Sequence, residues 1–312
     1  MKTVVLVGGV GGAKLALGLA HVLPPDDLTI VVNTADDTWM YGLRVCPDLD
    51  TIMYTLSGLV DPQNGWGIAG DTTKLLEAMR RYGEDVWFKL GDQDFATHIL
   101  RTRWLNAGHR LTSITERLAK RLSIPQCILP MVDLPVATIV DTVEHGEIDF
   151  QTYFVRYRWQ PTVKSLRLDG IEKASISPEL QQAVESADCL LVAPSNPWLS
   201  VAPILSIPGL RDLMLSRPIP RVAISPIVGG QAIKGPAAKL MTELGLEVSA
   251  RSVVAYYGDI INGFVYDQVD HEIEVPLVHS TRLNTVMLTD NDKVQLATNV
   301  LEWMKSWAKT PS

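Results

Sequence analysis

The fold is decided by residues 3–14, which read Thr-Val-Val-Leu-Val-Gly-Gly-Val-Gly-Gly-Ala-Lys. The apolar and β-branched run over residues 3–7 predicts a short buried strand. A loop with four glycines follows, and residues 13–23 then carry apolar side chains at helical spacing until Pro24 and Pro25 end the helix. Residues 28–32 form a second apolar run. The stretch therefore predicts a strand–loop–helix–strand unit of a buried parallel sheet.

Later segments repeat this pattern. A strand is predicted over residues 186–193, after a helix over residues 179–185. Another strand is predicted over residues 221–225, after a helix over residues 209–215. Residues 71–81 and 95–122 read as mostly helical, residues 128–159 as short alternating strands, and residues 290–308 as one amphipathic helix. We predict a single α/β domain over residues 1–312. Its doubly wound, mainly parallel, Rossmann-like sheet would carry an inserted helical and antiparallel region over approximately residues 71–175.

Composition narrows the class of protein. The 312 residues are 46% hydrophobic and 20% charged, which is typical of a globular protein. With 28 Lys and Arg against 35 Asp and Glu, the net charge of -7 argues against nucleic-acid and membrane partners. The three cysteines are far apart, and the N-terminal apolar run is too short for a signal peptide. With no stretch of 18 apolar residues either, we expect a cytoplasmic protein.

The glycine loop is a candidate anion site. Gly8, Gly9, Gly11 and Gly12 allow backbone N–H groups to approach a ligand closely, at a helix N-terminus that carries partial positive charge. Lys14 adds a point charge. The loop matches neither the Walker A pattern nor the GxGxxG dinucleotide pattern. The alternative interpretation is a tight turn that binds nothing.

Acidic residues cluster after the second predicted strand. Asn33, Asp36 and Asp37 follow that strand directly, and Asp48 and Asp50 precede the next helical run. In an open α/β sheet the carboxyl ends of the strands form the ligand crevice. Four carboxylates beside a phosphate-binding loop would repel it and one another, so we predict that they hold Mg²⁺. Taken singly, Asp36 and Asp48 are better explained as a helix cap or turn former, and only the combination favours a metal.

Three further stretches offer polar groups near the same sheet edge. Lys89 lies in an apolar run before a Gly-Asp turn that ends at Asp92, and it either holds an anion or extends into solvent. Asp94, His98 and Arg101 share one helix face, where His98 is a buried structural group or a catalyst. Two strand-end loops complete the set, at residues 193–198 and 225–230, although turn chemistry uses the same residue types.

Six motifs in order resemble the 2-phospho-L-lactate transferase family, at residues 7–14, 32–37, 46–51, 89–92, 193–197 and 225–230. The resemblance implies an enzyme of coenzyme F-420 biosynthesis. It would move a phospho-three-carbon-acid group, 2-phospholactate or phosphoenolpyruvate, from a guanosine diphospho-linked donor to the ribityl hydroxyl of the deazaflavin Fo. GMP would be released, Mg²⁺ required and a homodimer formed. Which acid is transferred stays open.

The resemblance also assigns residues. Asp50 and Lys89 match positions where the family contacts Fo, and we take both as catalytic candidates, with Asp50 orienting the hydroxyl or acting as base. Trp39 and Asp92 are further candidates for the deazaflavin, and Tyr54, Trp66 and Trp87 are available for an aromatic slot. The metal candidates are Asp36, Asp37, Asp48 and Asp50. The residues predicted to bind the guanine nucleotide are Gly8, Gly9, Gly11, Gly12, Lys14, Asn33, Ser195, Asn196, Gly229 and Gly230.

Two other interpretations compete. Gluconeogenesis-factor-like proteins, which are nucleotide-sugar-binding regulators, share the glycine loop and the Asp pair but typically continue with Gly-Gly-Ser-Ser. This chain instead reads Thr-Trp-Met-Tyr over residues 38–41 and Pro-Asp-Leu-Asp-Thr over residues 47–51. In an NAD-dependent oxidoreductase, Asp36 would accept a hydrogen bond from a ribose hydroxyl of the cofactor. That interpretation gives Asp48 and Asp50 no role.

Overall fold

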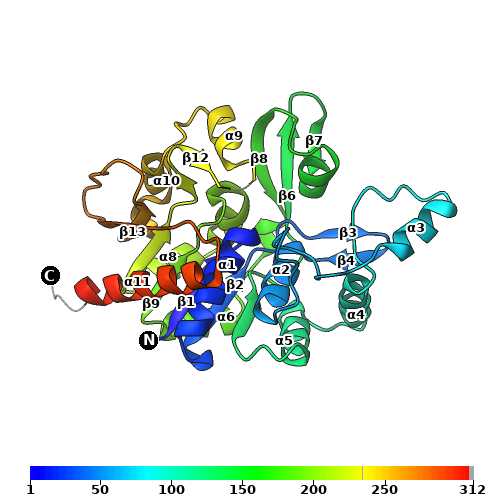
Figure 1. Ribbon diagram of the computed structural model, residues 1–312, viewed down its shortest axis with the longest axis horizontal. Helices are drawn as coiled ribbons and strands as arrows, with labels where there is room; N and C mark the ends of the chain where they lie inside the picture. The colour runs from blue at the N-terminus through cyan, green and yellow to red at the C-terminus, as the bar shows by residue number, and fades with distance from the viewer. Residues whose placement is uncertain (234, 309–312) are drawn as a thin grey trace.

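The computed structural model describes residues 1–233 and 235–308. Its centre is a seven-stranded sheet in the order β14-β13-β10-β9-β1-β2-β5, and every pairing in that sheet is parallel (Figure 1). The strands are β1 (Thr3–Val7), β2 (Leu28–Val32), β5 (Cys127–Pro130), β9 (Cys189–Val192), β10 (Arg221–Ile224), β13 (Gly263–Asp267) and β14 (His279–Leu283). The predicted doubly wound α/β class is confirmed.

Helices cover both faces of this sheet. Side chains of β1 alternate between two hydrophobic clusters, with Val5 and Val7 in one and Val4 and Leu6 in the other. This explains why the strand is apolar at every position. On the Val5 side pack α1 (Gly9–Val22), α2 (Pro47–Leu56), α4 (Asp94–Asn106), α5 (Leu111–Arg121) and α11 (Asp290–Ala308). On the other side pack α6 (Pro178–Ser186), α7 (Ala202–Leu205), α8 (Leu210–Leu215), α9 (Ala237–Glu243) and α10 (Ala250–Tyr257).

Smaller elements extend from the carboxyl edge of the sheet. They are the hairpin β3 (Thr38–Met40) and β4 (Leu43–Val45), the helix α3 (Lys74–Arg81), the antiparallel sheet of β6 (Ala137–Thr142), β7 (Gly146–Asp149) and β8 (Val163–Asp169), and the hairpin β11 (Ile227–Val228) and β12 (Gln231–Ala232). The region of residues 71–175 is not continuous, because β5 returns to the central sheet and pairs with β2. A helical insertion therefore precedes β5, and an antiparallel insertion follows it.

The short helices complete the chain: η1 (Pro25–Asp27), η2 (Thr152–Arg156), η3 (Ile171–Lys173), η4 (Pro197–Val201) and η5 (Gly258–Ile260). In the range that the structure covers, residues 1–233 and 235–308, no helix is both long enough and apolar enough to cross a bilayer.

The strand order reverses at β1, which lies between β2 on one side and β9 on the other. In open α/β sheets, such a reversal leaves a crevice at the carboxyl ends of the two strands that flank it. The glycine loop follows β1, and the loop with Ser195 follows β9. Two of the three predicted nucleotide loops therefore meet at the position where this fold class binds its ligands.

Candidate active site

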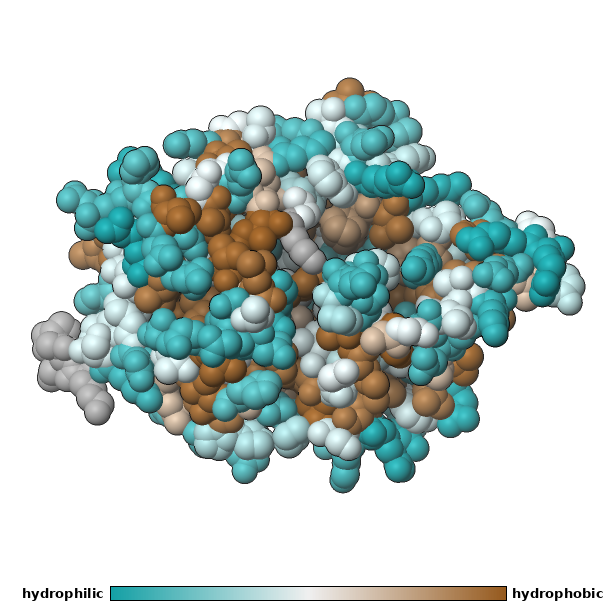
Figure 2. Space-filling model, in the orientation of Figure 1, coloured by the Kyte–Doolittle hydropathy of each residue, from teal (hydrophilic) through white to brown (hydrophobic). Residues whose placement is uncertain are grey.

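A cavity of about 560 Å³ opens at this reversal point. Its walls come from the glycine loop, the start of α2, the loop after β9, both insertions and the segment before α11. Figure 2 shows hydrophobic residues gathered on either side of a hollow near the centre of the molecular face. Ten of the predicted site residues line the cavity: Gly8, Gly9, Gly11, Lys14, Asp36, Asp48, Asp50, Lys89, Ser195 and Asn196.

The glycine loop is locked to the loop after β9. The backbone N–H of Gly8 donates to Ser195 Oγ at 3.0 Å, and the same hydroxyl donates to the carbonyl of Gly8 at 2.8 Å. A Cβ on Gly11 would run into the Pro194 carbonyl, and one on Gly12 would lie 2.9 Å from Ser195 Oγ. Glycine is therefore required at both positions for the loops to close. Gly12 faces this contact rather than the cavity.

Asn196 presents an unused donor. Its Oδ1 accepts the backbone N–H groups of Trp198 and Leu199, at 3.0 and 3.1 Å, and so caps the start of η4. Its Nδ2 is buried and has no hydrogen-bond partner among the described residues. Since a buried donor without a partner costs free energy, this amide is suited to an oxygen atom of a ligand in the cavity.

Two acids share a single amide. Nδ2 of Asn33 donates to Asp36 Oδ2 at 2.9 Å and to Asp48 Oδ2 at 3.2 Å. Burial, and then the charge of Asp48, raise the pKa of Asp36 well above its usual value, and burial raises the pKa of Asp48 to about 6. Neither acid forms an ion pair with a described basic side chain, and Asp36 Oδ1 has no partner there. Such a crowded pair fits a divalent cation. Asn33 itself holds the acids together and does not line the cavity.

The other two predicted metal ligands face arginines instead. Nη2 of Arg44 lies 3.2 Å from Asp37 Oδ2, and the Arg101 guanidinium donates to both oxygens of Asp50. Burial raises the pKa of Asp37 to about 7 against the attraction of Arg44. Asp37 does not line the cavity. The four acids thus divide into a pair open to a metal and a pair already matched by cations.

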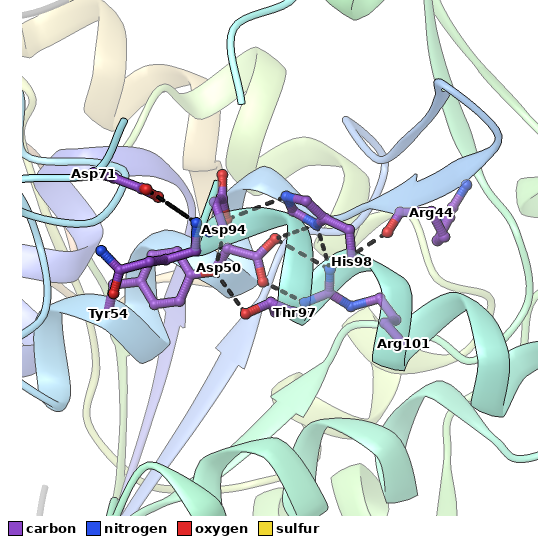
Figure 3. Close-up of polar contacts among 9 residues, drawn as sticks. Arg44, Asp50, Tyr54, Asp71, Asp94, Thr97, His98 and Arg101 are labelled. Atoms are coloured by element: carbon purple, nitrogen blue, oxygen red, sulfur yellow. Dashed lines mark hydrogen bonds and ion pairs between the residues drawn. The ribbon is translucent and has the colours of Figure 1, made fainter. Parts of the chain in front are cut away.

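A buried network surrounds Asp50 (Figure 3). Nδ1 of His98 lies 3.6 Å from Asp50 Oδ2, and its Nε2 lies 3.1 Å from Asp94 Oδ1. The Tyr54 hydroxyl donates to Asp94 at 2.6 Å. Although burial alone would raise it, the contact with His98 and the hydrogen bond from Tyr54 lower the pKa of Asp94. Asp50, Asp94 and His98 are spaced closely enough for a metal ion, but the Arg101 guanidinium already satisfies Asp50. Asp94, His98 and Arg101 therefore share one face of α4, as their spacing in the sequence predicts.

Aromatic side chains form another part of the wall. Of the aromatic candidates from the sequence, Tyr54 and Trp66 line the cavity, whereas Trp39 and Trp87 do not. Trp39 is 56% exposed on β3. The aromatic lining that the sequence analysis missed comes from two separate segments, one with Phe88 and the other with Phe150, Phe154 and Trp159. No local pattern marks these residues, because only the topology brings them together.

Asp92, predicted to contact the deazaflavin, lies outside the cavity lining. Its carboxylate accepts the backbone N–H groups of Lys74 and Leu75 at 3.2 and 3.0 Å, and the hydroxyl of Thr72 also donates to it. These bonds lower the pKa of Asp92, that from Thr72 most. In this structure Asp92 therefore stabilises the N-terminus of α3.

Gly229 and Gly230 also lie outside the lining. They are the two central residues of the β11–β12 hairpin, with φ angles of 57° and 72°. A two-residue hairpin loop of type I′ has positive φ at both positions, which explains the glycine pair. The N–H of Gly229 donates to Asp270 Oδ1 at 2.8 Å.

A family model described as 2-phospho-L-lactate transferase CofD matches residues 3–303. The chain belongs to the 2-phospho-L-lactate transferase family. It is 40% identical over 303 residues to the 2-phospho-L-lactate transferase of Methanosarcina mazei, covering 96% of this chain and 99% of that one. It is 40% identical over 301 residues to the phosphoenolpyruvate transferase of Streptomyces griseus, covering 94% of each. These equal identities leave the transferred acid open.

One solved structure has the same overall fold as this chain. It is a Bacillus halodurans protein of the upf0052 family, with a TM-score of 0.63 and 15% sequence identity, and the match covers 96% of this chain and 99% of that one. At that identity, the likeness concerns the architecture alone.

Proposed function

We propose that this chain transfers 2-phospholactate or phosphoenolpyruvate from a guanosine diphospho-linked donor to the ribityl hydroxyl of deazaflavin Fo and releases GMP. One observation carries the proposal: a single cavity joins a glycine loop and the Asp36–Asp48 pair to an aromatic wall. The first part suits linked phosphates and the second a flat ring. The names of the curated relatives support the same class of reaction.

The donor phosphates would lie against the start of α1. Its first residues line the cavity, at the positive end of a 14-residue helix. The Lys14 side chain lines the same wall, where its Nζ donates to the Met287 carbonyl at 2.6 Å. Together with the amide of Asn196, these groups supply the donors that phosphate oxygens need.

Asp36 and Asp48 would hold the Mg²⁺ ion. The pair shares one amide and lacks a cationic partner among the described residues, and Asp36 Oδ1 accepts no hydrogen bond there. When bound, the ion would neutralise charge on the linked phosphates. We assign no metal contact to Asp37 or Asp50, because an arginine already neutralises each.

We assign Asp50 the task of orienting the acceptor hydroxyl. The Arg101 guanidinium holds this carboxylate in one orientation at the cavity wall. In the transfer, the acceptor oxygen forms a bond to phosphorus, the bond from that phosphorus to GMP breaks, and the hydroxyl proton passes to Asp50. Lys89 lies exposed between the buried residues Phe88 and Leu90, and would contact the acceptor.

Mass spectrometry tests this proposal. Purified protein is incubated with Fo, Mg²⁺ and each of the two guanosine diphospho-linked acids. We expect a product with the mass of Fo plus one phospho-acid, together with an equal amount of GMP. Absence of product with both donors would overturn the proposal. Calorimetry with a UDP-sugar supplies the contrast, because binding without transfer would support a nucleotide-sugar-binding regulator.

We also propose a cytoplasmic homodimer, on the basis of the cysteine pattern and the family resemblance. Light scattering at two protein concentrations measures the assembly directly, and a mass of 34.4 kDa at both would contradict the dimer.

A further inference from the structure

A strained turn lies at the aromatic wall. The π-helix η2 is followed by Arg158 and Trp159, whose φ angles are 51° and 48°. Residues with a Cβ rarely adopt this left-handed region, because the Cβ approaches the following carbonyl. Within residues 1–233 and 235–308, this is the one place where two consecutive non-glycine residues do so.

The turn is held by backbone hydrogen bonds. Tyr157 donates to the Thr152 carbonyl at 2.9 Å, and Trp159 donates to the Tyr153 carbonyl at 2.9 Å. Tyr153 is buried in the cluster beneath the antiparallel sheet, so the turn is anchored to the protein interior. The conformation of Trp159 is therefore built into the fold.

Packing does not account for the Trp159 ring. The side chain is 40% exposed, belongs to none of the hydrophobic clusters of the described residues, and contacts no other aromatic ring there. It lines the main cavity and also an adjoining open hollow. Strained backbone that presents an unpacked ring at a cavity is typical of a ligand-binding position.

The surroundings of this segment indicate which ligand. The Arg156 guanidinium pairs with Asp85 at 3.1 Å and lies 5.5 Å from the ring centroid of Trp87. Val155 packs against the cluster that contains Phe88 and Leu90, the two neighbours of Lys89. The helix η2 therefore adjoins the segment that we assign to the acceptor, and Trp159 follows the end of η2 by three residues.

We propose that Trp159 sets acceptor specificity by stacking on the planar ring of Fo. This inference rests on the proposed function and adds a residue to it. Phe154 differs from Trp159, because one face of its ring already stacks on Phe150, with ring centroids 5.3 Å apart. Stacking between two flat rings is tolerant of ring substituents but demands a planar partner, so Trp159 would select planar acceptors over other alcohols.

Two glycine variants separate the ring from the backbone strain. Trp159→Gly and Arg158→Gly each relieve one left-handed residue, but only the first removes the ring. Calorimetry measures Fo and GDP binding to both variants and to the wild type. We expect Trp159→Gly to weaken Fo binding about tenfold while GDP binding stays within twofold. Arg158→Gly should leave both affinities within twofold, and Trp159→Phe should retain most of the Fo affinity.

Each contrary outcome has one meaning. Fo binding within twofold of wild type in Trp159→Gly overturns the stacking proposal, as does a loss of GDP binding in place of Fo binding. If Trp159→Gly unfolds, Trp159→Phe and Trp159→Leu decide instead, because a leucine that binds Fo as well as phenylalanine does excludes stacking. A wild-type chain that binds GDP but not Fo would overturn the proposed function itself.

Discussion

At the scale of single residues, charge compensation separates the four early acids. Asp37 and Asp50 each face an arginine, whereas Asp36 and Asp48 share only the amide of Asn33. Buried carboxylates without a cation destabilise the folded state as soon as they ionise. The second pair therefore makes the metal-free protein less stable than its core alone would allow.

Replacing Asp48 by Asn should stabilise the metal-free protein at neutral pH. Burial raises the pKa of Asp48 from 3.8 to about 6, so ionisation costs free energy only in the folded state. That cost is absent below pH 4 and complete once the pH exceeds the folded value. The gain over wild type should grow across this window to on the order of 2 kcal/mol, as measured by urea unfolding. A gain independent of pH would contradict this account.

Magnesium should reverse the ranking of these two proteins. Millimolar Mg²⁺ would bind the folded wild type and raise its unfolding midpoint, whereas Asp48→Asn has lost one of the two proposed ligands. Thermal scans of both proteins with Mg²⁺, and in a metal-free buffer that contains EDTA, measure the difference in unfolding midpoint. Equal stabilisation of both proteins by Mg²⁺ would exclude Asp48 as a ligand.

Asp50→Asn should abolish transfer, and it should also destabilise the fold. The structure shows the Asp50 carboxylate buried against the Arg101 guanidinium. Removing one partner of a buried pair costs about 3 kcal/mol, because the other charge is left uncompensated. Urea unfolding checks the loss. The double variant Asp50→Leu, Arg101→Met should recover stability but not transfer. A double variant that stays as unstable as Asp50→Asn would contradict the ion-pair explanation.

At the scale of the elements, apolar patterns predict several of the buried segments, although the fully buried strand β13 was missed. The helix predicted over residues 290–308 has those bounds in the structure, and β9 and β10 fall within their predicted ranges. The polar strand β14 shows no apolar pattern and was missed, because it lies at the sheet edge with one face in solvent. The predicted helical stretch of residues 95–122 divides into α4 and α5 at Gly108, whose φ is 83°.

Gly18→Ala tests the contact between α1 and α11. A Cβ at Gly18 would overlap the backbone carbonyl of Lys293 and approach Ala297, so the two helices must separate to admit it. Although alanine favours a helix, overpacking against backbone should lower the unfolding free energy by about 1–3 kcal/mol. Transfer kinetics at 25 °C should be unchanged, since α1 contacts the cavity only through its first turns. A variant as stable as wild type would contradict this expectation, because it would show that α11 can move away from α1 without a loss of stability.

At the scale of the whole molecule, the cavity is a product of topology. The glycine loop and the acids were predictable, because each directly follows an apolar strand whose carboxyl end must face the crevice. The lining residues Phe150, Phe154 and Trp159 belong to an insertion that no periodicity places beside α2. Likewise, nothing local marks Arg101 as the partner of Asp50, which lies 51 residues earlier.

Ending the chain after Thr289 should prevent folding. Helix α11 contributes Leu296, Ala297, Val300, Leu301 and Met304 to the cluster on the α1 face, and all are buried. Without them that face of the sheet would expose a large apolar surface. We expect a truncated product that is insoluble or lacks a cooperative thermal transition, as judged by near-ultraviolet circular dichroism. A soluble, cooperatively unfolding product would contradict this expectation.

The central position of β1 has a consequence for synthesis on the ribosome. This first strand is hydrogen-bonded to β9, whose first residue, Cys189, is made almost two hundred residues later. Until that segment leaves the exit tunnel, one edge of the nascent β1–β2 pair stays open and offers its amides to any neighbouring chain. The N-terminal half is therefore a natural client for chaperones that bind emerging polypeptides, and slow translation between the two strands would prolong its exposure.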